Sequence, residues 1–263
     1  NCILVASVLA EVEKTVPYQS NMHYRNVTFQ LINMIAHHNK IDEGTGDALT
    51  KKQISLLIIA ACIHDLGHDG RGNTDGEGVH HPSRVEKISF ELAQPYLREA
   101  GCSHEGDLSD IQTLLFCTDA SPLMDPDNPV SQMKSAYCYH FLEGEGPYLR
   151  DDLAVLKERR DLALMGLLLH EADIATSAGL HYNVTKFETQ LYRDEVGPDK
   201  ACPTHVIEFL DRICQKQMLS KAGQELYSRN LEAIYLRTKM AIEEGNVPYK
   251  RPEDSDFLRN VNF

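Results

Sequence analysis

Two apolar runs, residues 56–63 and 162–169, constrain the fold of this chain more than any other feature. Each run is apolar on nearly every side, which suits a helix at the centre of a globular core, and each is too short to cross a bilayer. The first run leads directly into the His-Asp pair at 64–65, and the second into the His-Glu-Ala-Asp segment at 170–173. Ionisable side chains beside a dry helix are costly to bury without partners. The sequence therefore predicts buried helices that deliver polar groups to an interior site.

Helical spacing of apolar residues recurs along the rest of the chain, and alternation with a period of two is nearly absent. Ser83 and Glu86 form a capping-box pattern that predicts the start of a helix running towards Gly101, and Gly67 is placed to help end the helix over 54–63. We expect further helices over residues 27–38, 111–117, 152–178, 204–217 and 221–244. The loops between them, at 70–82, 121–129, 144–147 and 196–203, do not resemble interdomain linkers. We therefore expect a single all-α domain over residues 1–263.

The charge balance limits the classes of partner. Lys and Arg number 26 against 39 Asp and Glu, which gives a formal net charge of -13. This argues against a surface that binds nucleic acid or an anionic membrane. A small anionic substrate stays compatible with it, because a bound metal ion reverses the field locally.

Cysteine usage and the first residues bear on the compartment. The seven cysteines are irregularly spaced and include no Cys-x-x-Cys pair, so we expect free thiols in a reducing, cytoplasmic environment. No basic segment precedes the apolar residues 3–9, so a signal peptide is not expected. Additional domains outside this stretch of sequence stay open.

Four residues from three parts of the chain are candidate metal ligands. His64 and Asp65 end the first apolar run, His23 stands at the start of an amphipathic helix, and Asp173 follows the second run. Two imidazoles and two carboxylates are ordinary ligands for Zn, Mn, Fe or Mg. His68, one turn beyond His64, places a third imidazole near them. Plainer interpretations are an ion pair at a helix end for the His-Asp pair, a surface histidine at 23 and a helix cap at 173.

The order His…His-Asp…Asp resembles the signature of the HD superfamily of metal phosphohydrolases. Longer segments resemble the catalytic domain of 3',5'-cyclic-nucleotide phosphodiesterases, over roughly residues 16–215 and most specifically over 64–73. The matching segments are Tyr18-Gln19-Ser20-Asn21-Met22-His23 against Tyr-His-Asn-x-x-His, His64 to Asn73 against His-Asp-x-x-His-x-Gly-x-x-Asn, Ser83-Arg84-Val85-Glu86, Thr118-Asp119-Ala120-Ser121 against Thr-Asp-Met-Ser, His170 to Ile174 against His-x-Ala-Asp-Leu, and Phe209-Leu210-Asp211 against Phe-Ile-Asp.

This resemblance implies a compact helical domain with two divalent metal ions, Zn with Mg or Mn being favoured and Fe left open. The ligands it implies are His23, His64, Asp65 and Asp173, with Asp65 bridging to the second ion. It also implies that Glu86, Asp119 and His68 orient bound water. A helix cap is the alternative for Glu86, and a solvated loop carboxylate is the alternative for Asp119.

The reaction implied is hydrolysis of a phosphodiester by a metal-activated hydroxide. The substrate would be a small phosphate ester, with a nucleotide, including a 3',5'-cyclic nucleotide, as the leading candidate. The residues carried over for catalysis are Asp65, Gln19, His68, Glu86 and Asp119.

Gln19 departs from the family pattern, because an imidazole that protonates the leaving alkoxide stands at this position in the phosphodiesterases. An amide cannot act as a general acid near neutral pH. Either His68 or another histidine takes over, or the leaving group needs no acid, or the domain is a weak or inactive enzyme.

The base pocket departs from the pattern as well. Val206 stands three residues before Phe209, where the family has a glutamine that reads the base, and valine cannot make the paired amide hydrogen bonds that a purine edge uses. Phe209 and Asn73 are further candidates for contact with the substrate. An ordinary core aromatic is the alternative for Phe209.

Three other functions stay open at this stage. One is a phosphomonoesterase or nucleotidase of the same superfamily. Another is a di-iron oxygenase, which needs extra imidazoles that His80, His81 and His104 could supply. The last is a regulatory module that binds metal without turnover.

Overall fold

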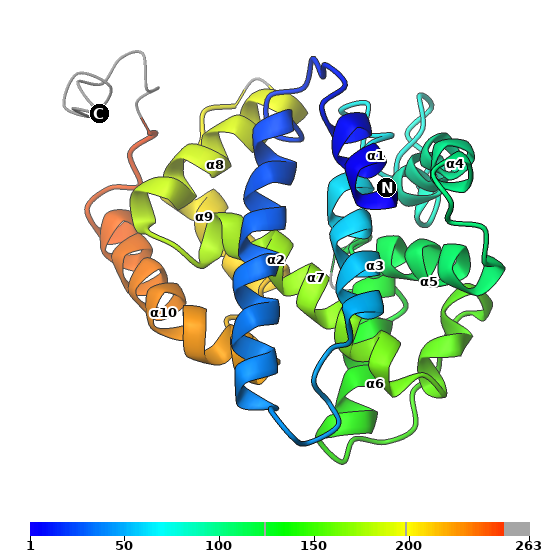
Figure 1. Cartoon of the computed structure of the whole chain (residues 1–263). Helices are drawn as coiled ribbons and strands as arrows, with labels where there is room; N and C mark the ends of the chain where they lie inside the picture. Colours follow the sequence, from blue (N-terminus) through cyan, green and yellow to red (C-terminus); the bar gives the residue numbers. More distant parts are fainter. Residues whose placement is uncertain (124, 198, 250–263) are drawn as a thin grey trace, which may run out of the picture.

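The fold is organised around one central helix, α7 (Arg160–Ala178), in a computed structural model that describes residues 1–123, 125–197 and 199–249. Almost every residue of α7 is buried, as expected for a helix that carries the apolar run 162–169. It packs against α2 (Asn21–Ile41) and α3 (Lys51–Ile63), which lie in front of it in Figure 1. The two predicted buried helices, α3 and α7, are therefore neighbours of the same core.

The other helices surround this centre. On one side of α7 lie α1 (Cys2–Ala10), α4 (Arg84–Glu99), α5 (Glu105–Phe116) and α6 (Pro129–Phe141), and a 3-10 helix, η1 (Asp151–Lys157), precedes α7. On the other side lie α8 (Tyr182–Val196), α9 (Pro203–Arg212) and α10 (Lys221–Glu243). One hydrophobic core includes buried residues from Ala6 to Tyr249. The described residues form no strand beyond an isolated bridge between Thr74 and His80, so the predicted all-α fold is confirmed.

Local capping explains where several helices begin. Thr50 and Gln53 form a complete capping box at the start of α3. The Asn128 side chain accepts from the Ser131 amide, with Pro129 in the first turn of α6, and Ser220 caps α10 through the Gly223 amide. These side chains satisfy amides that the helix itself leaves unpaired.

The predicted helix over 152–178 is wrong in its first part. Residues 151–157 form the separate 3-10 helix, and α7 begins only at Arg160. Arg159, between them, has a non-helical backbone and binds Asp110 and Asp161 with its guanidinium. The helices α1, α6 and α8 were not among the sequence predictions.

Two local predictions are corrected. The capping box at Ser83 and Glu86 does not form, because Ser83 adopts a left-handed backbone (φ 54°) and its hydroxyl binds Asp119 instead. Gly67 does not end α3, which stops at Ile63. A Cβ at Gly67 would lie 2.6 Å from Cγ2 of Ile88, so this glycine allows α4 to approach the turn after α3 closely.

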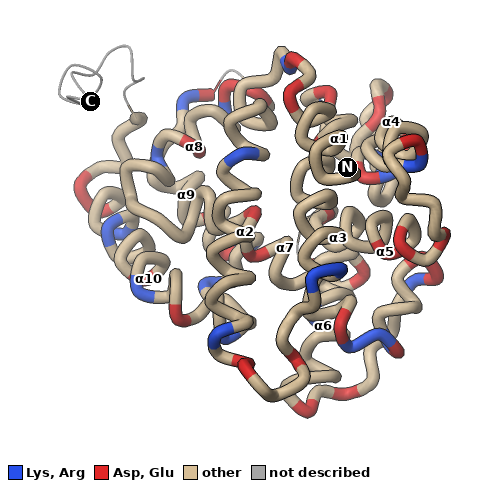
Figure 2. The backbone as a smooth tube through the Cα atoms, viewed as in Figure 1, with Lys and Arg blue, Asp and Glu red and all other residues tan. Residues whose placement is uncertain are grey.

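Charged residues of both signs occur on α4, α7, α8, α9 and α10. Figure 2 shows acidic residues distributed over many helices and loops of the chain. Within the described ranges, no helix combines the length and apolar character that crossing a bilayer requires.

The close packing of α7 gives a stability prediction. A Cβ at Gly166 would lie 2.7 Å from Sγ of Cys117 and 3.2 Å from Cγ of Met133. The overpacking should cost about 1–3 kcal/mol, and the better helix propensity of alanine returns at most about 1 kcal/mol. We expect Gly166→Ala to lower the free energy of unfolding by about 1–2 kcal/mol in urea denaturation.

The matched control is Gly146→Ala, because a Cβ there would meet no atom within 4 Å. Its effect should stay within about 0.5 kcal/mol. Equal effects of the two substitutions would show that α7 is less tightly packed than the structure indicates.

Candidate metal centre

Three helices bring the four predicted ligands together. His23 lies in the first turn of α2, His64 and Asp65 follow the end of α3, and Asp173 lies on α7. Nε2 of His64 is 3.0 Å from Oδ2 of Asp65, and Nε2 of His23 is 3.6 Å from the same oxygen. These three residues offer ligand atoms that all lie within 4.8 Å of one another. Asp173 contacts this group through His23, because Nε2 of His23 is 3.1 Å from Oδ1 of Asp173.

The orientation of the His64 ring suits a metal ligand. Its Nδ1 lies 2.8 Å from the carbonyl oxygen of Ala61, so Nδ1 carries the proton and donates to the backbone. Nε2 then faces the carboxylate of Asp65 but makes no hydrogen bond there, and His64 is only 1% exposed. A ring fixed by a backbone carbonyl, with its other nitrogen buried and unsatisfied, is the usual arrangement of a metal-bound histidine. The site therefore fits a cation.

The electrostatics of the pair follow from this contact. Burial opposes the charged forms of both residues, yet the mutual attraction prevails. The negative charge of Asp65 and its direct contact with the imidazole raise the pKa of His64 to about 9, and the charge of Asp173 adds to this shift. The pKa of Asp65 lies well below its usual range because of three nearby imidazoles, of which His64 has the largest effect and His68 and His23 smaller ones. In the metal-free protein, a proton on His64 thus balances the buried carboxylate.

Glu86 and Asp119 lie in a second layer of buried carboxylates. Asp119 accepts from the Ser83 amide at 2.8 Å and the Ser121 amide at 2.9 Å, and also binds both hydroxyls. Glu86 accepts from the Asn73 side chain at 3.1 Å. Burial, and then the charge of Asp119, raise the pKa of Glu86 well above its usual value. Asp119 is 2% exposed, so it is not a solvated loop carboxylate.

Asn73 connects these groups and does not line the large cavity described below. Its side chain donates to Glu86 and to Ser121 and accepts from the Val85 amide at 2.7 Å. All of its hydrogen-bonding groups are thus engaged within the protein, which favours a structural role over the predicted contact with substrate.

His68 lies in the turn after α3 and no longer on the helix. Its Nδ1 accepts from the Gly70 amide at 3.1 Å and is 3.4 Å from Oε1 of Glu195. The amide assigns the acceptor role to Nδ1, so a neutral ring carries its proton on Nε2.

Lys14 and Glu195 are two members of the site that sequence reasoning missed. Glu195, at the end of α8, accepts from the backbone amides of Tyr18 and Gln19 at 2.9 and 3.0 Å, which fixes the segment before α2. Lys14 donates to the backbone carbonyl of Asp65 at 2.5 Å. Neither residue belongs to an apolar run or a matched motif, so only tertiary structure reveals them.

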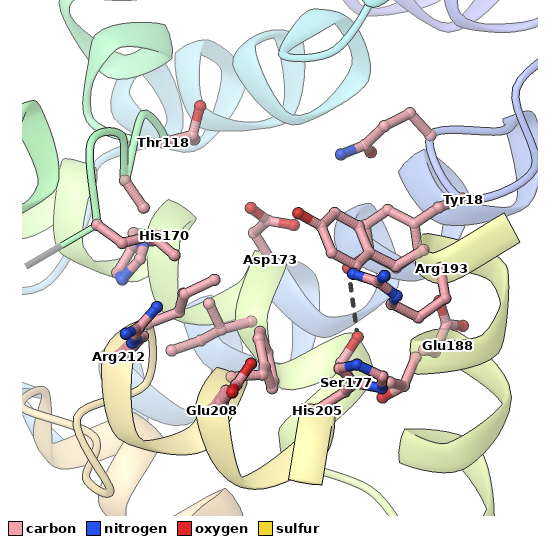
Figure 3. Close-up of a pocket in the computed structure, with 18 residues that line it drawn as sticks. Tyr18, Thr118, His170, Asp173, Ser177, Glu188, Arg193, His205, Glu208 and Arg212 are labelled. Atoms are coloured by element: carbon pink, nitrogen blue, oxygen red, sulfur yellow. Dashed lines mark hydrogen bonds between the residues drawn. The ribbon is translucent and has the colours of Figure 1, made fainter. Parts of the chain in front are cut away.

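A cavity of about 320 Å³ opens beside the four ligands. Figure 3 shows Asp173 pointing into it, between His170 and Thr118 on one side and Tyr18 on the other. Gln19 also lines the cavity, and its Oε1 atom is buried without a partner. The cavity adjoins the candidate metal centre and is large enough for a small organic phosphate.

Helix α9 forms one wall of the cavity. Phe209, a predicted candidate for contact with the substrate, lines the cavity and is partly buried. Val206 is fully buried in the core and is not part of the lining, so it does not take the place of a base-reading side chain. Its neighbours His205 and Glu208 face the cavity instead.

The histidines considered for a di-iron centre lie elsewhere. Nε2 of His81 pairs with Asp75 at 2.6 Å, and the side chain of His104 is 75% exposed beside Asp107. Neither these residues nor His80 joins the His23–His64–Asp65 cluster among the described residues.

Comparison with known proteins adds no family assignment. No protein-family model matches this chain, and no curated protein matches it. The resemblance to HD phosphohydrolases therefore stays a prediction, and the geometry of the site carries the functional argument.

The His64–Asp65 pair predicts how stability depends on pH without metal. The pKa of His64 rises from 6.5 to about 9 on folding, so its stabilising contribution is complete below pH 6.5 and is lost as the pH rises through 9. Urea denaturation with a chelator present should show the free energy of unfolding falling across this window, by at most on the order of 3 kcal/mol.

His64→Gln removes the titrating group and should flatten this profile. A fall of the same size in His64→Gln would show that other groups cause it, and a flat wild-type profile would contradict the raised pKa.

Proposed function

We propose that this protein is a metal-dependent phosphohydrolase that cleaves a small phosphodiester. The metal ligands are His23, His64, Asp65 and Asp173. The observation that carries the proposal is the cluster of His23, His64 and Asp65, which contacts Asp173 on α7, a residue that lines the cavity. The ring of His64 suits a metal ligand, because its Nδ1 is anchored by the carbonyl oxygen of Ala61 and its Nε2 is directed at the carboxylate of Asp65.

We propose two divalent ions, Zn with Mg or Mn. Bound ions of this kind lower the pKa of water and neutralise charge on phosphate oxygens. Structural pairs of buried histidine and carboxylate do not need a cavity beside them, whereas an enzyme does. Asp173 contacts the cluster and also lines the cavity, and this connection favours hydrolysis over a purely structural metal site.

The surrounding residues position groups and hold protons. Glu86 is fixed by the side chain of Asn73, and Asp119 is fixed by the amides of Ser83 and Ser121. His68 holds a proton on Nε2, because the Gly70 amide occupies Nδ1. Glu195 keeps Tyr18 and Gln19 in place at the cavity wall through their amides. Tyr18 in turn packs on the ring of His23, with ring centroids 4.9 Å apart.

Gln19 limits the substrates that this centre can process. Its amide can donate or accept a hydrogen bond but cannot release a proton near neutral pH. We infer that the enzyme favours leaving groups that depart without protonation, or that His68 supplies the proton from Nε2. The first option also suits a phosphomonoester, which makes a phosphomonoesterase the second candidate.

Metal uptake and hydrolysis test the proposal together. The purified protein should bind divalent metal and hydrolyse bis(p-nitrophenyl) phosphate, whose leaving group needs no proton. Asp65→Asn should lower kcat by at least about a hundredfold, because a carboxylate that would hold the metal is lost. His104→Ala, a change of an exposed histidine, should leave metal content and kcat unchanged. Normal metal content and activity in Asp65→Asn would exclude this centre.

Replacing the missing acid tests the role of position 19. Gln19→His should raise turnover of diesters with alkyl leaving groups by about 10–100-fold, while turnover of bis(p-nitrophenyl) phosphate changes little. The two substrates are compared in steady-state assays on metal-loaded protein. No gain in a folded variant with full metal content would contradict the explanation offered for Gln19.

A further inference from the structure

One end of the cavity contains a histidine whose polar groups are unused. His170 lies on α7, one turn before Asp173, and lines the same cavity. It is 1% exposed, and neither of its ring nitrogens has a hydrogen-bond partner in the described structure. A neutral imidazole offers one donor and one acceptor, and leaving both unmet in the interior costs about 1–3 kcal/mol for each group. His170 is therefore poised to bind something that the cavity admits.

Lys134, on α6, carries a buried amino group close enough to influence His170, although Lys134 itself is not among the residues that line the cavity. It is 8% exposed, and it is the charged group whose field acts on His170. Its only hydrogen bond within the described part of the chain is a long one, 3.4 Å to Oε1 of Gln215. An ammonium group has three donors, so most of its hydrogen-bonding capacity is unmet.

The nearest buried carboxylate does not neutralise Lys134. Glu171 uses Oε1 to accept from the amides of Leu219 and Ser220, and Oε2 to accept from the Ser220 hydroxyl. The described residues give Lys134 no ion pair within 4.0 Å. A buried charge that lacks a full counter-charge is costly, and an incoming anion would remove that cost.

Arg212 completes this end of the cavity from α9. It is exposed, it lines the cavity, and it makes no ion pair in the described ranges even though Glu208 lies one turn earlier on the same helix. Figure 3 shows its guanidinium on the same side of the cavity as His170, opposite Tyr18 and Arg193. A guanidinium at the edge of a cavity binds phosphate oxygens with two parallel hydrogen bonds.

We propose that His170 and Arg212, supported by the positive charge of the buried Lys134, form a second anion site, which binds a phosphoryl group of the substrate other than the one that is cleaved. This rests on the proposed function, in which the cleaved phosphate lies at the metal centre. Residues three apart on a helix have Cβ atoms about 5–6 Å apart, so the two anionic groups would lie about one helical turn from each other. The substrate class is then a phosphate ester with a second phosphoryl group close to the first.

Three carboxylates share the cavity and act against an anion. Asp173 belongs to the proposed metal centre, where a bound cation would balance its charge. Burial raises the pKa of Glu188, which favours its neutral form. Glu208 is exposed to solvent, where its field is screened. Lys134 is held in the protein interior, where its field is screened less than that of the exposed Glu208.

The test uses metal-free protein in the presence of a chelator, so that the metal centre cannot bind the probe. Inorganic phosphate is titrated at constant ionic strength, with chloride as the balancing anion, and binding is measured by calorimetry and by the shift in melting temperature. We expect a single site for phosphate. Lys134→Met and Arg212→Gln should each weaken it by about tenfold or more.

Controls separate loss of binding from loss of structure. Arg229→Gln changes an exposed arginine on α10 away from the cavity lining and should bind phosphate as the wild type does. Lys134→Met should melt no lower than the wild type without phosphate, because it removes an under-paired buried charge. Phosphate that binds no better than chloride, or equally well to all the variants, would overturn the second site.

The outcome is distinguishable from a failure of the proposed function. Phosphate binding that depends on Lys134 and Arg212, in a protein that takes up no metal, would retain this site and remove the hydrolase. Hydrolysis of bis(p-nitrophenyl) phosphate without such phosphate binding would retain the hydrolase and exclude the second anion site. If both hold, Arg212→Gln should raise KM for substrates with two phosphoryl groups by a larger factor than KM for bis(p-nitrophenyl) phosphate.

Discussion

The packing of α7 against α2 and α3 is the constraint on which the rest of the structure depends. These helices are held together by apolar side chains, and His23, His64, Asp65 and Asp173 enter the core only because their helices do. Bringing polar groups into a dry interior is unfavourable unless they are paired. Apolar packing thus supplies the free energy that holds a polar cluster in place, and the cluster requires a cation or a proton to balance its carboxylates.

In the metal-free protein, this charge balance has to come from a proton. A proton on His64 performs the balancing role, because the adjacent Asp65 raises the pKa of the imidazole. A divalent ion would take the place of that proton, with the ring already oriented by the Ala61 carbonyl. The same logic applies to His170, which lines the cavity and is buried with no hydrogen-bond partner in the described structure, while Lys134 has one long hydrogen bond. A charged ligand would complete these polar groups.

The sequence predicts the helical class correctly, and it also predicts that His23, His64 and Asp65 lie together, because both depend on strong local signals. The apolar runs that become α3 and α7 determine the core, and the ionisable residues that follow each run lie where the helices meet. Spacing along the chain does not show which distant segments will touch, which is why Glu195 and Lys14 were missed. Helix α8 was missed for a related reason: its sequence is mostly polar, and its helical form depends on packing against α7 and α9.

Errors at element ends have specific physical causes. Local chemistry allowed a capping box at Ser83, but the carboxylate of Asp119, which is distant in sequence, binds that hydroxyl instead. The helix expected over 152–178 is interrupted because Arg159 binds Asp110 on α5, a partner that sequence reasoning does not supply. The position of Val206 likewise depends on which side of α9 faces the core. In each case a tertiary contact overrides a local preference.

The most direct test of the account is the location of a bound ion. Crystals grown with Zn²⁺ should give an anomalous scattering peak within coordination distance, about 2.0–2.2 Å, of Nε2 of His23, Nε2 of His64 and the carboxylates of Asp65 and Asp173. A strong peak at these four residues would establish the metal centre. Fully loaded crystals with no peak there, or with zinc only at surface histidines, would contradict the central claim.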